Sequence, residues 1–143
     1  MAVTSTLSNH FKYQLYKGNI DFDTDDFKII LMNTTFAFDK DADATLADVT
    51  SDQLATNYGY TQDSKSLAGV SITEDDVNDK AYVTWNDVTW TASGGTIGAS
   101  GAAIIYDDTT SDDTVVGCID FGEDLSAPAG IDFQVKDLQI DLT

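Results

Sequence analysis

The run Phe27-Lys28-Ile29-Ile30-Leu31-Met32 is the stretch from which the fold can be worked out. All of its side chains except that of Lys28 are apolar. A short continuous apolar run bounded by polar segments is typical of a strand that is buried on both faces. Residues 27–32 are therefore expected to form a central strand of a sheet.

Other segments rich in β-branched and aromatic residues follow at short intervals, and turn residues separate them. The expected strands cover 66–73, 83–85, 88–90, 98–106, 114–121 and 131–142. The apolar residues of the last segment change parity near Lys136-Asp137, which predicts a bulge there. About seven to nine short strands in one domain, 1–143, indicate a mainly β fold, an antiparallel β-sandwich or jelly roll.

Two similar triplets, Val83-Thr84-Trp85 and Val88-Thr89-Trp90, flank the pair Asn86-Asp87. Two β-prone triplets around such a pair predict a tight hairpin with a two-residue turn. In that hairpin Trp85 and Trp90 would lie on opposite faces of the sheet. One tryptophan would then be in the core and the other nearer the surface.

One N-terminal helical segment, 1–18, is expected to pack on the sandwich. Leu7, Phe11 and Leu15 recur at helical spacing, and Gly18 follows as a stop signal. Ser5 or Thr6 is the expected N-cap. A short helical turn is also expected near residues 46–54.

The charge of the chain limits what it can bind. It has 23 Asp and 2 Glu against 7 Lys and no Arg, which gives a formal net charge of −18. Nucleic-acid affinity comes largely from Lys and Arg side chains that neutralise phosphates, and anionic membranes would repel the chain for the same reason. We therefore expect neither nucleic acid nor membrane as a partner.

The sequence has few features of an enzyme. His10 is the only histidine and lies in the expected helix, and no nucleophile elbow or phosphate loop is present. Cys118 is the only cysteine, and its apolar surroundings indicate a buried hydrophobe. We predict no enzymatic activity, no catalytic residue and no cofactor.

One acidic segment resembles a calcium loop. Asp39-Lys40-Asp41-Ala42-Asp43 has alternating acids, but Ala44 stands where the loop needs glycine and Thr50 where it needs a bidentate glutamate. The acidic segments 21–26 and 107–113 are as easily explained by composition. No metal site is predicted, and solvated acidic loops are the preferred interpretation.

A carbohydrate-binding module is the alternative from another functional class. The aromatic residues Trp85, Trp90, Tyr58 and Tyr60 could form a platform that stacks on sugar rings. The opposite faces expected for the two tryptophans count against such a platform.

Several strings, in order along most of the chain, resemble small virion proteins of tailed bacteriophages. They are Asp21–Leu31, Asn57–Tyr60, Leu67–Gly69, Asp87–Ala92, Ala103–Thr110 and Val116–Gly122. The resemblance implies a β-rich protein on the outer surface of the virion, a head decoration or cement protein that stabilises the head shell. A tail, neck or fibre-associated protein is the alternative within that class.

The resemblance also implies the partners. They would be the major capsid protein and further copies of the chain, in a homo-oligomer for which a trimer would be suitable. Phe11, Tyr13, Leu15 and Tyr16 carry more aromatic surface than one face of a short helix can bury. These residues are the candidate subunit interface.

Overall fold

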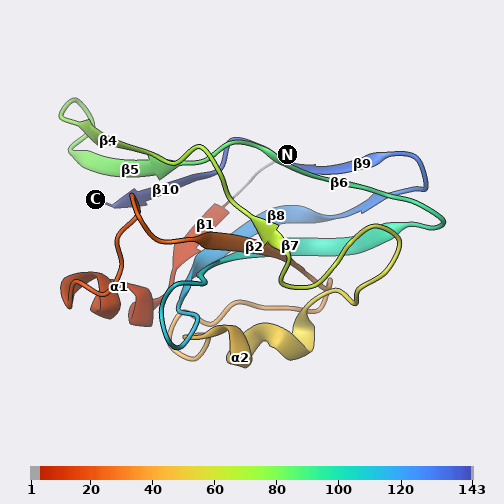
Figure 1. Cartoon of the computed structure of the whole chain (residues 1–143), viewed down its shortest axis with the longest axis horizontal. Coiled ribbons are helices and arrows are strands. Elements are labelled where there is room, and N and C mark those ends of the chain that lie inside the picture. The colour runs from red at the N-terminus through yellow and green to blue at the C-terminus, as the bar shows by residue number, and fades with distance from the viewer. Residues whose placement is uncertain (1–3, 143) are drawn as a thin grey trace.

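The computed structural model describes residues 4–142. Its central element is a five-stranded antiparallel sheet with the strand order β1-β8-β7-β2-β3 (Figure 1). The strands are β1 (Thr4–Leu7), β2 (Phe27–Met32), β3 (Lys65–Ser66), β7 (Ile97–Asp107) and β8 (Val115–Ala127).

Two smaller antiparallel sheets cover one face of the central sheet (Figure 1). One has the order β10-β5-β4 and the other pairs β6 with β9. Their strands are β4 (Ser71–Asp75), β5 (Lys80–Thr84), β6 (Val88–Thr91), β9 (Asp132–Val135) and β10 (Gln139–Leu142). Side chains from all three sheets share one hydrophobic core. The mainly β, antiparallel fold is as predicted and is compatible with a β-sandwich, and its sheets are not closed into a barrel.

The opposite face of the central sheet carries the loop after β2, the short helix α2 (Leu46–Val49) and the 3₁₀ turn η1 (Thr50–Asp52) (Figure 1). Val49 packs there in a second buried cluster with Ile30, Met32 and Ile104. The helical turn expected near 46–54 is confirmed.

Strand β2 is buried on both faces, as its composition predicts. Ile29 and Leu31 belong to the core beneath the small sheets, and Ile30 and Met32 belong to the cluster under α2. None of the four side chains is more than 1% exposed. The alternation of a strand explains how consecutive apolar residues supply two separate cores.

The N-terminal helix is shorter than expected. Helix α1 covers Asn9–Tyr16, whereas Thr4–Leu7 is the strand β1 that pairs with β8. The N-cap is Ser8 and not Ser5 or Thr6, because the Ser8 Oγ accepts a hydrogen bond from the Phe11 N–H. Residues 1–3 of the expected helical segment lie outside the described residues.

The predicted hairpin over 83–90 is wrong. Strand β5 pairs with β4 and β10, and β6 pairs with β9, so the chain leaves one sheet for the other at Asn86-Asp87. The Asn86 N–H donates to the Ala68 carbonyl at 2.9 Å, and the Asp87 carboxylate accepts from the Asp137 N–H at 3.0 Å. Long-range hydrogen bonds therefore replace those of a local turn.

Two other expected strands are divided by similar crossings. The segment expected over 66–73 becomes β3 and β4, which belong to different sheets, with Gly69 at a φ of +70° between them. The expected bulge near Lys136-Asp137 is the crossing from β9 to β10, where Asp137 has a φ of +55°.

None of the helices in residues 4–142 is long and apolar enough to span a membrane.

Candidate interaction surface

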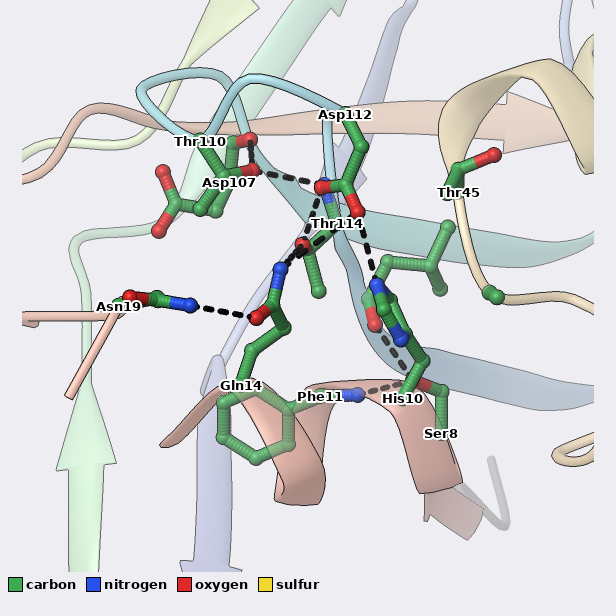
Figure 2. Close-up of polar contacts among 12 residues, drawn as sticks. Ser8, His10, Phe11, Gln14, Asn19, Thr45, Asp107, Thr110, Asp112 and Thr114 are labelled. Carbon is green, nitrogen blue, oxygen red and sulfur yellow. Dashed lines mark hydrogen bonds and ion pairs between the residues drawn. The ribbon is translucent and has the colours of Figure 1, made fainter. Parts of the chain in front are cut away.

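Helix α1 is held on the sandwich by the buried residue Ser8. Its Oγ donates to the Val115 carbonyl at 2.6 Å and accepts from the Phe11 N–H at 2.9 Å (Figure 2). Its own N–H donates to the Val116 carbonyl at 3.0 Å. These three bonds satisfy a helix-terminal donor and fix the start of the helix to β8.

Side chains on α1 also contact the loop between β7 and β8. His10 points toward Asp112, with 2.8 Å between Nε2 and Oδ2, and Gln14 points toward Thr114, with 3.4 Å between Nε2 and Oγ1 (Figure 2). Burial acts to raise the pKa of Asp112, but hydrogen bonds from Thr114 and His10 outweigh it and lower the pKa. The helix is thus attached both at its start and along one side.

The remaining side of α1 exposes two aromatic residues. Tyr13 is 56% exposed and Tyr16 is 94% exposed. The ammonium group of Lys17 lies 5.8 Å from the centre of the Tyr13 ring, and the neighbouring Lys12 is exposed as well. This set, Lys12, Tyr13, Tyr16 and Lys17, is called the α1 patch below.

The four candidate interface residues divide into two pairs. Phe11 is fully buried in the chain's own core, where its ring meets Phe22 edge-on at 5.8 Å, so its assignment to a subunit interface is wrong. Leu15 packs against the same core. Tyr13 and Tyr16 remain available to a partner, and their role stays a prediction. Their offset from the apolar stripe of the helix is the signal that separates the two pairs.

The acidic segments use their carboxylates to hold their own turns. In 21–25 and in 39–43, the first Asp accepts from the N–H of the third residue, and the fifth Asp accepts from the N–H of the first. Within residues 4–142, no three His, Cys, Asp or Glu side chains are arranged to hold a metal ion.

The aromatic residues considered for sugar binding do not form an exposed platform. Trp85 is 6% exposed, Trp90 3% and Tyr60 2%, and all three belong to the core. Only Tyr58 is substantially exposed. The expectation that one tryptophan lies nearer the surface is wrong, because Trp85, directly after β5, and Trp90, in β6, belong to the same core.

Cys118 is buried, as its apolar surroundings predict. Burial raises the pKa of its thiol to about 12. The thiolate is the reactive form of cysteine, and the raised pKa disfavours it at neutral pH.

Sequence reasoning missed Asp107, which it treated as part of a solvated loop. The residue is fully buried at the end of β7, and its Oδ1 accepts from the Thr109 N–H at 2.9 Å. Burial raises the pKa of Asp107 to about 7, and hydrogen bonding with the Asp25 carboxyl contributes to the rise. The alternation of side chains along a strand could have predicted this burial, because Asp107 lies on the same face of β7 as Ala103 and Ile105, which are in the core.

Comparison with known proteins adds no relative to this description. A scan against protein-family models gives no match, and neither the search of curated proteins nor the search of solved structures gives one.

Proposed function

We propose that this chain is a non-enzymatic structural protein of a tailed-bacteriophage virion, a head decoration or cement protein that binds the major capsid protein. The observation that carries the proposal is the α1 patch. It presents exposed aromatic side chains on a helix whose start and one side are fixed to the sandwich. Tyrosine is enriched at protein interfaces, and a fixed helix loses little conformational entropy on binding.

The charge of the chain supports a position on the outside of the particle. Packaged DNA is polyanionic, and a chain with a net charge of −18 gains nothing from contact with it. An outer subunit can instead bind at many equivalent sites of the shell. Repetition over a lattice, or oligomerisation as a trimer, would turn modest single contacts into lasting attachment.

The position is tested by immunogold electron microscopy of particles from the culture that produces this protein, with antibody against the recombinant chain. Gold spread over the heads supports decoration. Gold confined to tails or to one vertex favours the tail, neck or fibre alternative. The proposal is contradicted if particles stay unlabelled both when they are intact and after mild disruption has exposed their inner proteins to the antibody.

The role of the α1 patch is tested by binding the recombinant chain to particles stripped of it. The variant Y13S/Y16S should lose at least about tenfold in affinity, because two large interface side chains are removed. The matched control is Ile131→Ser, which changes another apolar residue that is 55% exposed. Equal binding by the two variants would remove the patch from the interface.

A further inference from the structure

A groove of about 570 Å³ lies over the central sheet on the side of α2. Its buried floor includes the small residues Ala102 and Cys118, from β7 and β8. The half-buried rings of Phe36 and Phe38, from the loop after β2, line its wall and pack against the cluster under α2. The groove is thus partly apolar and large enough for side chains of another molecule.

Three exposed carboxylates from β8 line the same groove, those of Asp120, Glu123 and Asp124. Asp120 Oδ1 accepts from the Gly122 N–H at 2.8 Å, which orients that carboxylate. Gly101 leaves room for the carboxylate of Asp124, because a Cβ atom at position 101 would lie 3.2 Å from Asp124 Oδ1. No lysine is among the described residues that line the groove, so it presents uncompensated negative charge beside aromatic rings.

We propose that this groove binds lysine or arginine side chains from a basic segment of a partner protein. The aliphatic stem of such a side chain would pack on Phe36 and Phe38, and its charged end would meet the carboxylates of β8. This combination of apolar and anionic surface matches a long cationic side chain better than it matches an apolar or an anionic one. The inference is independent of the virion assignment, because it holds for any partner with this chemistry.

A second copy of the chain is a poor occupant of the groove. Each copy carries a net charge of −18, so two copies repel one another. Lys28 and Lys80 are paired within the chain, to Asp108 at 3.1 Å and to Asp141 at 2.9 Å. Lys12 and Lys17 are exposed in the α1 patch, but the copy that carries them still has a net charge of −18. A basic partner supplies the missing positive charge without this cost.

The test uses a fluorescein-labelled peptide of alternating lysine and serine, titrated by anisotropy at about 0.15 M salt, where long-range attraction is screened. The same peptide with glutamate in place of lysine is the negative control. The groove variant D120N/E123Q/D124N should bind the lysine peptide about tenfold more weakly, since three charge pairs are lost.

A matched variant, E74Q/D76N/D79N, removes the same charge from a second acidic depression on the β4–β5 hairpin, which contains Lys80 and lacks phenylalanine. It should bind the peptide within about twofold of the unmodified chain. Equal losses in the two variants would mean that only the overall charge matters and would overturn the proposal.

The aromatic wall is tested separately with F36L/F38L, which keeps apolar packing and removes the rings. We expect weaker peptide binding and a small fall in the unfolding midpoint, because both rings pack against the cluster under α2. Should that variant be unstable, amide chemical-shift mapping on the unmodified chain decides: changes at Gly101 and Gly122 support the groove. Changes at the hairpin tip, or spread over the whole acidic surface, overturn it.

Discussion

The hydroxyl of Tyr60 accepts a hydrogen bond from the backbone N–H of Leu31 at 3.0 Å, in the fully buried interior. Strand β3 pairs only with Lys28 and Ile29, so β2 continues beyond its neighbour. The Leu31 carbonyl is satisfied by the Leu54 N–H at 2.9 Å. The Leu54 backbone and the Tyr60 side chain thus form the hydrogen bonds that a neighbouring strand would otherwise supply to β2 at Leu31.

The variant Tyr60→Phe should lower the free energy of unfolding by about 1–3 kcal/mol, because a buried donor loses its acceptor. The Gln53 Nε2, which donates to the same hydroxyl at 2.9 Å, loses its acceptor as well. Urea unfolding measures the change. The control Tyr16→Phe alters a hydroxyl on a 94% exposed side chain and should stay within about 0.5 kcal/mol of the unmodified chain. Equal stability of the two variants would show that the Leu31 contact contributes nothing.

Asp107 should make the stability of the protein depend on pH. Its pKa is about 7 in the folded state, where burial and Asp25 favour the protonated form, against an ordinary value of 3.8. The folded state therefore binds more protons than the unfolded state between these values, and stability falls as pH rises from about 4 through 7. Its Oδ2 has no hydrogen-bond donor among the described residues, which disfavours the ionised form further.

The variant Asp107→Asn should flatten this dependence, measured by urea unfolding at about pH 5 and pH 8. Asp113, whose pKa is also raised by burial, will leave a residual slope of the same sign. The pKa values of Asp48 and Asp141 are lowered, so these two residues make stability rise with pH, and only at pH values below the ordinary pKa of aspartate. An unchanged slope in the variant would rule out Asp107 as its source.

The variant Ser8→Ala should destabilise the protein by about 1–2 kcal/mol, because both the N-cap of α1 and the bond to the Val115 carbonyl are lost. The matched control is Ser5→Ala, at an exposed position in β1 and one of the two residues, Ser5 and Thr6, that the sequence predicts as the cap. We expect the control to be nearly neutral, and amide exchange in α1 to accelerate only in the Ser8 variant. A larger effect at Ser5 would restore the longer helix.

The sequence predicts those features that depend on local pattern. The apolar run of β2 and the mainly β composition report burial directly, and the structure confirms them. Of the predicted helical stripe, Phe11 and Leu15 lie in α1 and pack on the core, whereas Leu7 belongs to β1. Strand partners depend instead on contacts far apart in the chain. The Asn86-Asp87 pair is compatible with a tight turn, and only its hydrogen bonds to Ala68 and Asp137 exclude one.

The candidate site follows the same division. Helical periodicity could have separated the exposed Tyr13 and Tyr16 from the buried Phe11. The contact of His10 with Asp112 joins residues 102 positions apart, and no local pattern encodes it. The carboxylates of Asp120, Glu123 and Asp124 are close in sequence, but they lie beside Phe36 only after β2 and β8 have both paired with β7.

Tryptophan fluorescence should distinguish the observed crossing from the hairpin that the sequence suggests. In the structure Trp85 and Trp90 are both buried, so a neutral quencher such as acrylamide should reach neither in the folded chain. The single-tryptophan variants W85F and W90F should each show blue-shifted emission and only a small part of the quenching measured in urea. A two-residue hairpin would place one of the two rings near solvent, because residues 85 and 90 would then lie on opposite faces. Strong quenching in just one variant would therefore contradict the separate sheets of β5 and β6, whereas equal protection in both supports the path of the chain through Asn86-Asp87.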